Sequence, residues 1–298
     1  MIVNRKHEWE LHCHSRFSDG QLTCPDLFAL AVTNGVRHMA LTDHDTAAGY
    51  RAALANAWVP AELELYPAAE LSCVWKGRTI HMVGLGIDAY SERWLSIEND
   101  YVERRENRFL RILHVMRKAG FELNEERIRA IAHPGPPARP HVAAYLVETE
   151  QAKNTAQLYK RWLGQGKIGD VKSQWPEMAE AAQWILECGG LPVVAHPHRY
   201  DLTWTKTREM LDDFCAAGGQ AIEIACVGLN PEKRKFLSNQ AQERNLYASG
   251  GSDFHSPNTP WLKLGTYPEW PKDLPTASDW LRTRMATLKA LESNATSR

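Results

Sequence analysis

Residues 10–20 have the sequence ELHCHSRFSDG. The pattern predicts a short strand over residues 9–14, in which alternate side chains point to the same face, so His12 and His14 lie side by side. Two imidazoles at one strand end can share a metal ion. Asp19, at a turn marked by Ser18 and Gly20, adds a carboxylate oxygen nearby. The stretch therefore predicts a metal site at the end of a strand.

Length and composition limit the class of protein. The chain has 298 residues, which suits an α/β barrel of about 250 residues with an insertion. With 44% hydrophobic and 24% charged residues it is not a disordered chain, and its net charge of −1 gives no global attraction to nucleic acid. No window approaches the roughly 18 apolar residues of a membrane span, and the first residues lack the apolar run of a signal peptide. We expect a cytoplasmic protein that needs no membrane and no obligate protein partner.

The cysteines predict no disulfide framework. None forms a CxxC pair and most fall in apolar segments, which indicates reduced, buried thiols. The six are Cys13, Cys24, Cys73, Cys188, Cys215 and Cys226.

Strand and helix patterns alternate on both sides of a helical block. Strands are predicted at 9–14, 37–42, 63–66, 71–75, 79–85, 191–195, 221–226 and 246–249. Helices are predicted from a capping box at Thr23–Asp26, and over 47–57, 177–188, 208–217 and 232–243. Lys76-Gly77 marks a hairpin. Residues 99–175 are charged and helix-rich, without convincing strands. This order predicts a parallel α/β barrel from residues 1–98 and 176–298, with an inserted helical module over 99–175 that covers the active-site mouth.

Further metal-binding residue types recur where the later elements end. Carboxyl ends of barrel strands share one face, so such side chains are plausible neighbours. A single histidine at a strand end is more often a hydrogen-bonding residue than a ligand, but nine positions in the same context favour a metal site. Because one ion takes only about four to six ligands, nine ligands indicate several ions. The nine are His12, His14, Asp19, His44, Glu70, His81, His196, Asp253 and His255.

These motifs together resemble the PHP (polymerase and histidinol phosphatase) superfamily. The matching segments are HCH with SDG, LTDHD (41–45), ELS (70–72), His81, AHP (195–197) and SDFH (252–255). HSRxSDG, AHPxRY and the helical insertion are most similar to the group of ribonuclease AM and 3′,5′-nucleoside bisphosphate phosphatase. The resemblance implies a distorted (β/α)7 TIM-like barrel with a trinuclear site. Glu10 departs from the pattern, since Asp is more usual before Leu-His, and this places a supporting hydrogen bond in question.

The resemblance also implies which ligands share an ion. One ion would take His12, His14, Glu70 and Asp253. A second would take Glu70, His81 and His196, with Glu70 bridging. A third would take Asp19, His44 and His255. The family usually works with Mn²⁺, and mixed imidazole and carboxylate ligands suit Mn, Fe or Zn.

Such a site predicts hydrolysis without a covalent intermediate. Ions about 3.5–4 Å apart lower the pKa of a shared water and offset charge on a phosphoryl group, so we expect in-line attack by metal-bound hydroxide. Cys13 faces away from the histidine pair and is not expected to act as a nucleophile. His198 is the candidate for protonating the leaving oxygen.

Substrate binding requires cations besides the metals. Arg105 falls within the apolar stripe of the helix predicted from residue 99, and Arg108 lies at its edge. One interpretation is a buried salt bridge with the barrel. The other, favoured by the resemblance, is a phosphate clamp at the barrel mouth. Further candidates are Arg16, Arg139, His141 and Arg199.

The resemblance implies a metal-dependent phosphoesterase acting on nucleotides or RNA ends. Two related activities are implied, removal of the 3′-phosphate from nucleoside 3′,5′-bisphosphates such as pAp and 5′→3′ degradation of 5′-monophosphorylated RNA. The basic insertion suits a short or end-bound nucleic acid. The alternatives are a phosphatase of the histidinol-phosphate type and a non-catalytic, metal-binding regulatory barrel.

Overall fold

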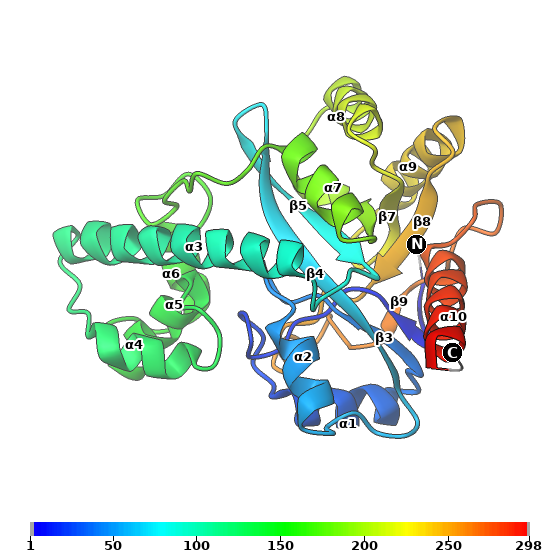
Figure 1. The fold of residues 1–298 in the computed structure, drawn as a ribbon. Helices are drawn as coiled ribbons and strands as arrows, with labels where there is room; N and C mark the ends of the chain where they lie inside the picture. Colours follow the sequence, from blue (N-terminus) through cyan, green and yellow to red (C-terminus); the bar gives the residue numbers. More distant parts are fainter. Residues whose placement is uncertain (1–2, 297–298) are drawn as a thin grey trace.

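A seven-stranded sheet forms the centre of the computed structural model, which describes residues 3–296 (Figure 1). Neighbouring strands follow chain order, and all pairs are parallel except those that β5 makes with β4 and β6. The strands are β2 (Trp9–Glu10), β3 (His38–Leu41), β4 (Glu64–Trp75), β5 (Arg78–Leu85), β6 (Leu191–Val194), β7 (Ala221–Cys226) and β8 (Tyr247–Gly251). The fold is thus a mixed, barrel-like sheet with one antiparallel strand, where the sequence pattern predicted a parallel barrel.

The sheet closes on itself beyond the regular strands. The strand predicted over residues 9–14 pairs regularly only at β2, but the chain continues alongside the end of β8. His14 N donates to Phe254 O over 2.9 Å, and Asp253 N donates to His12 O over 2.8 Å. The first and last strands therefore meet through the residues that carry the predicted ligands.

The hairpin predicted at Lys76-Gly77 is confirmed. Trp75 pairs with Arg78, and both turn residues have positive φ angles of 47° and 77°, as in a two-residue type I′ turn. The two strands predicted at 63–66 and 71–75 are one continuous strand, β4. Pro67 lies opposite Leu41, the last residue of β3, so its missing N–H falls where that ladder ends.

Helices cover the outside of the sheet. Outside the helical segment between β5 and β6 they are α1 (Cys24–Asn34), α2 (Ala48–Ala55), α7 (Met178–Glu187), the short 3₁₀ helix η2 (Pro197–Arg199), α8 (Trp204–Ala216), α9 (Pro231–Glu243) and α10 (Ala277–Thr296). The predicted cap of α1 is present, because the Thr23 side chain accepts a hydrogen bond from Asp26 N. The sequence pattern did not predict α10, whose Ala277 and Leu281 join a core cluster with Trp9 and Leu191 at the amino ends of the parallel strands.

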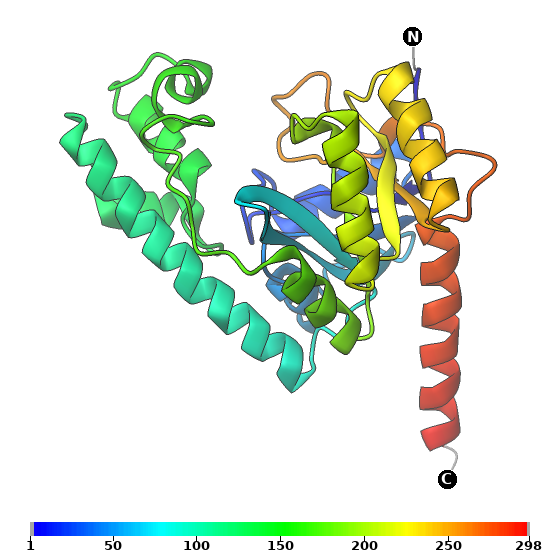
Figure 2. The ribbon, with the colours of Figure 1, turned by 90° about the horizontal axis from the view of Figure 1, so that it is seen from above.

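The segment between β5 and α7 is helical, as expected. It contains α3 (Glu92–Lys118), α4 (Glu125–Ala132), α5 (Arg139–Glu148), α6 (Thr155–Leu158) and the π-helical turn η1 (Tyr159–Leu163). It extends to one side of the sheet (Figure 2).

Helix α3 belongs to two cores. Trp94 and Tyr101 pack in the large barrel cluster, whereas Phe109 and Met116 pack in a separate cluster with the rest of the helical segment. The predicted boundary between residues 98 and 99 falls inside this helix. A rigid helix thus joins the segment to the barrel.

The remaining strands form a small sheet. It consists of β1 (Asn4–Lys6) and β9 (Thr266–Pro268), which pair antiparallel. Over residues 3–296, no helix has both the length and the apolar character needed to cross a membrane.

Candidate metal centre

Glu70, in the middle of β4, is surrounded by imidazoles. Its Oε2 lies 3.3 Å from both His12 Nε2 and His14 Nε2 and 3.0 Å from His44 Nδ1. Its Oε1 lies 3.0 Å from His81 Nδ1 and 2.9 Å from His196 Nε2. One buried carboxylate therefore links five of the predicted ligands.

His12, His14, Glu70 and Asp253 form the first group around a common point. Both His12 Nε2 and His14 Nε2 lie 3.3 Å from Glu70 Oε2 and also 3.3 Å from Asp253 Oδ1. Donors bound at about 2.0–2.2 Å to one tetrahedral ion lie about 3.3–3.6 Å apart. All four residues are buried, and their donor atoms lie within 4.8 Å of one another. The spacing is that of four ligands around one ion.

A second group forms around Asp19. Its Oδ1 lies 3.3 Å from His255 Nε2 and 3.8 Å from His44 Nε2, and His14 completes the group. The ring of His255 stacks on that of His14, with centroids 4.0 Å apart. Asp19, His44 and His255 are therefore brought together as the third predicted ligand set requires.

The structure pairs His44 differently from the sequence-based sets. His44 uses Nε2 towards Asp19 and Nδ1 towards Glu70, where it groups with His81. His81 and His196 both approach Glu70 Oε1. His44 is thus a neighbour of two predicted ion positions instead of one.

The donor atoms fit resident metal ions. Eight side-chain atoms among the nine residues are buried without a hydrogen-bond partner: His12 Nε2, His14 Nδ1 and Nε2, Asp19 Oδ1, His44 Nδ1, Glu70 Oε2, His196 Nδ1 and Asp253 Oδ1. Buried polar atoms are almost always paired, so a cluster of unpaired lone-pair donors needs an electron-pair acceptor. Imidazole nitrogens and carboxylate oxygens are ligands for first-row transition metals.

The electrostatics keep the carboxylates ionised. Burial alone would raise the pKa of Glu70, but His12, His44 and His81 outweigh it and hold that pKa well below its usual range. His255 and His44 do the same for Asp19 against its burial. Burial lowers the pKa of His44 well below its usual value. At neutral pH Glu70 and Asp19 are therefore charged carboxylates, the form that binds metal.

Glu223 is a functional residue that the sequence analysis missed. It lies on β7, where its Oε1 accepts from His12 Nδ1 and its Oε2 accepts from His196 N, both over 2.6 Å. In the neutral imidazole of His12 the first bond places the proton on Nδ1, so that Nε2 is the atom that would bind a metal ion. A single charged residue inside the apolar strand AIEIAC was the available signal.

We expect Glu223→Gln to weaken metal binding about 10- to 100-fold, the usual cost of losing a residue that orients a metal ligand. Glutamine keeps the side-chain shape but has only one acceptor oxygen, so it cannot accept from both His12 Nδ1 and His196 N. Titration of metal into chelator-treated protein measures the affinity. Glu232→Gln, a change at an exposed residue, serves as the control. Equal metal affinities for the two variants would contradict a role of Glu223 in orienting His12.

Two further carboxylates hold the loops that carry the ligands. Asp43 accepts from Ser15 N, Ser15 Oγ and Ser18 Oγ over 2.6–2.8 Å, which fixes the turn before Asp19. Glu10 accepts from His12 N and from both Ser252 N and Ser252 Oγ. The residue that departs from the family pattern thus still ties the ends of β2 and β8 together. Burial raises the pKa of Glu10 to about 7 despite these bonds.

The backbone is strained at the site. His196, Asp253 and Asp45 have φ angles of 28°, 51° and 59°. Each such angle at a residue other than glycine costs on the order of 1–3 kcal/mol, and it persists only where surrounding contacts enforce it. Here the strain lies at two ligands and beside His44.

Arg105 is held in a buried ion pair. Its Nη2 lies 2.6 Å from Asp45 Oδ2, and its Nε donates to the same oxygen over 2.7 Å. The side chain is 9% exposed, and its guanidinium lies over the Trp175 ring. Asp45 also accepts from Ser72 N and Oγ. Of the two interpretations of Arg105, this geometry matches the buried salt bridge. The ion pair joins α3 to the loop that carries His44.

Two other predicted substrate residues of the helical segment, Arg139 and Arg108, donate hydrogen bonds within that segment. Arg139 Nη1 donates to Asp170 Oδ1 over 2.9 Å, and Arg108 Nε donates to Val171 O over 3.1 Å. Burial, then the charges of Arg139 and Arg105, lower the pKa of Arg108 to about 10. Burial also lowers the pKa of His141, while Asp19 opposes that shift. The structure therefore gathers three arginines close together and His141 within the field of a predicted ligand.

Arg16 connects the site loop to the helical segment. Its Nη2 donates to His133 O over 2.9 Å, and Gly135 N donates to Arg16 O over 3.1 Å. A Cβ atom on Gly135 would lie 2.7 Å from Arg16 O, so only glycine allows this approach.

Arg199 and His198 lie on the other side of the site. Arg199 Nη1 donates to Asp253 Oδ2, so this arginine supports a predicted ligand. Burial, followed by Arg199 and His196, lowers the pKa of His198 to about 4. This lowered pKa does not favour His198 as a general acid, and its Nδ1 approaches Cys226 Sγ over 3.5 Å.

The cysteines take no part in the site. Cys13 packs in a core cluster with Leu27 and Phe28, as predicted, and burial raises the pKa of its thiol well above the usual range. All six cysteines are free, and only Cys215 is not fully buried.

Comparison with known families decides the identity. The PHP domain matches residues 10–190, which is more than half of the chain. The chain belongs to the PHP domain family. The resemblance and the barrel fold inferred from the motifs are thereby confirmed.

Relatives of this PHP protein include enzymes that act on nucleic acid and on nucleotides. A 5′-3′ exoribonuclease of Haemophilus influenzae is 38% identical, over 87% of this chain and 93% of its own length. A 3′,5′-nucleoside bisphosphate phosphatase of Chromobacterium violaceum is 34% identical, over 83% and 87%. A solved structure from the same organism, described as an amidohydrolase with bound sulfate and no metal, has a TM-score of 0.85 at 32% identity and covers 93% of this chain and 97% of its own. Both named relatives hydrolyse phosphate esters, and the prediction of a phosphoesterase is confirmed at that level.

Proposed function

We propose that this PHP protein removes the 3′-phosphate from nucleoside 3′,5′-bisphosphates and degrades 5′-monophosphorylated RNA from its 5′ end. The observation that carries the proposal is the cluster of nine imidazole and carboxylate side chains centred on two of their number, Glu70 and Asp19, with arginines of the helical segment nearby. The names of the relatives support both activities.

We propose three divalent ions, with Mn²⁺ as the working metal and Fe or Zn as alternatives. His12, His14, Glu70 and Asp253 would hold one ion. The remaining sets are Glu70 with His81 and His196, and Asp19 with His44 and His255. When bound, such ions supply water activation near neutral pH and offset charge on phosphoryl oxygens.

The chain's own residues would then orient the substrate. The helical segment, residues 99–175, covers the mouth in this proposal. Arg108, Arg139, His141 and Arg16 lie where it meets the barrel, and they would bind the 5′-phosphate of either substrate through charge-assisted hydrogen bonds. A 5′-phosphate held there leaves the 3′ ester of the same nucleotide directed at the ligand cluster. A cytoplasmic location stays a prediction from the sequence.

The test is substrate choice in the presence of Mn²⁺. Hydrolysis is measured on pAp, on histidinol phosphate, on a 5′-phosphorylated oligoribonucleotide and on its 5′-hydroxyl counterpart. Two charge-assisted contacts at about 1.5 kcal/mol each predict about a hundredfold preference in kcat/KM for the two substrates with a 5′-phosphate. Preference for histidinol phosphate would favour the small-molecule phosphatase, and metal binding without turnover of any substrate would favour the regulatory barrel.

A further inference from the structure

A small pocket opens between the amino ends of α8 and α9. Its volume is about 130 Å³, which is smaller than the roughly 300–1,000 Å³ of a site for a whole drug-sized ligand. It therefore suits one part of a substrate, such as a single ring. Its lining residues are Pro197, His198, Leu202, Thr203, Trp204, Thr207, Lys233, Phe236 and Leu237.

The pocket shares a wall with the ligand cluster. The wall is η2 and the residue before it. His196 contacts Glu70, the next two residues line the pocket, and Arg199 turns back to Asp253. A substrate bound at the ligand cluster can thus reach the pocket by crossing one turn of chain.

The lining offers an aromatic face beside a cation. Trp204, the first residue of α8, is 38% exposed, and its ring packs edge-on against Phe236 at 4.1 Å between centroids. Lys233 lies at the same pocket and donates to His198 O over 3.3 Å. A half-exposed indole at a pocket near a phosphate site is a surface on which a nucleobase can stack.

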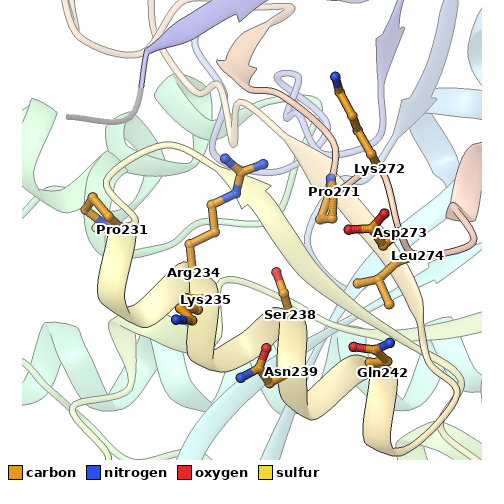
Figure 3. A pocket seen from close by; sticks show the side chains of 10 residues that line it. All are labelled: Pro231, Arg234, Lys235, Ser238, Asn239, Gln242, Pro271, Lys272, Asp273 and Leu274. Carbon is orange, nitrogen blue, oxygen red and sulfur yellow. The ribbon is translucent and has the colours of Figure 1, made fainter.

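A second hollow in the described part of the chain lacks this chemistry. Figure 3 shows it on the opposite side of α9, lined by Arg234, Lys235, Lys272 and seven other residues, none of them aromatic. The lining of this second hollow includes cationic side chains but no aromatic ring on which a base could stack.

The pocket and the arginines of the helical segment approach the site from different sides. The helical segment contacts Arg16 and Asp45, which follow β2 and β3. The helices α8 and α9 follow β6 and β7, which are separated from β2 and β3 by β8 in one direction around the closed sheet and by β4 and β5 in the other. In Figure 2 the helical segment lies at the left of the view, and α8 and α9 lie to its right.

We infer that this pocket receives the base of the second nucleotide of an RNA substrate, an inference that rests on the proposed function. In both proposed reactions water adds to the phosphorus on O3′ of the first nucleotide, the P–O3′ bond breaks, and O3′ leaves with a proton from that water. With the 5′-phosphate on the side of the helical segment, the group beyond the attacked phosphorus extends towards α8 and α9. RNA has a second nucleotide there, and a bisphosphate has none.

The test compares Trp204→Ala on two substrates. Loss of one stacked base predicts about a ten- to hundredfold lower kcat/KM on a 5′-phosphorylated dinucleotide, carried mainly by KM, with kcat/KM for pAp unchanged. Trp204→Phe keeps an aromatic face and is expected to keep most of the dinucleotide activity. Trp58→Ala is the matched control, because Trp58 is 36% exposed but follows α2, away from the pocket.

A dinucleotide with an abasic second residue provides the substrate-side arm. For the wild type, removal of the second base is expected to lower kcat/KM by the same factor as Trp204→Ala does on the normal dinucleotide. For Trp204→Ala, kcat/KM is expected to be the same on the abasic and the normal dinucleotide. An unchanged dinucleotide-to-pAp ratio in Trp204→Ala, or an equal loss on both substrates, overturns the pocket assignment. Wild-type protein that is inactive on both substrates contradicts the proposed function instead.

Discussion

Glu70→Gln is expected to lower kcat/KM more than a hundredfold and to reduce the metal content of the protein. Glu70 faces five imidazole nitrogens within 3.3 Å, so the amide replaces the charge shared by the ligand groups with a neutral oxygen and an N–H donor. Loss of a residue that only orients a ligand lowers metal affinity or activity by up to about a hundredfold. Loss of a ligand that several ions share is expected to lower them further.

The measurement pairs kinetics on pAp with elemental analysis of metal per chain. Glu62→Gln, an exposed change just before β4, is the matched control and should leave both unchanged. Glu70→Gln with normal turnover and normal metal content would contradict the role of Glu70 as a shared ligand.

Arg105→Ala is expected to lower the free energy of unfolding by about 3–5 kcal/mol. Removing one partner of a buried ion pair leaves the other charge uncompensated, and the Asp45 side chain has no exposed surface. Chemical denaturation with a two-state fit measures the change. The double variant Arg105→Met with Asp45→Asn removes both charges and should recover part of the loss.

The same variant separates the two interpretations of Arg105. The salt bridge predicts a large loss of stability with a small change in KM for pAp. A strong rise in KM at unchanged stability would instead assign Arg105 to the phosphate clamp.

Local sequence signals predicted most elements of the fold. Lys76-Gly77 and Thr23–Asp26 act within a few residues, so the turn and the cap could be inferred without knowing the rest of the chain. The residue pairs that close the predicted barrel could not, because they join residues 12–14 to residues 253–254, which are far apart in the sequence. The dual role of α3 was also hidden, since its two halves pack against cores formed by distant segments.

Most candidate ligands were predictable because strand ends converge in a barrel, although Glu70 and His81 lie within the long strands β4 and β5 and not at their ends. Which nitrogen faces which carboxylate was not, as His44 shows by approaching both Asp19 and Glu70. The ion-pair partners of the arginines were harder to predict than the ligands. Arg105 and Arg199 are paired with Asp45 and Asp253, more than fifty residues away in each case, and no local pattern reveals such partners.

The central claim is that the ligands around Glu70 and Asp19 hold the metal ions on which phosphate-ester hydrolysis depends. The most direct measurement is phosphate release from pAp by chelator-treated protein during stepwise addition of Mn²⁺. The account predicts no activity in the treated protein and full recovery as about three ions bind per chain. Undiminished activity after complete removal of metal, confirmed by elemental analysis, would contradict it.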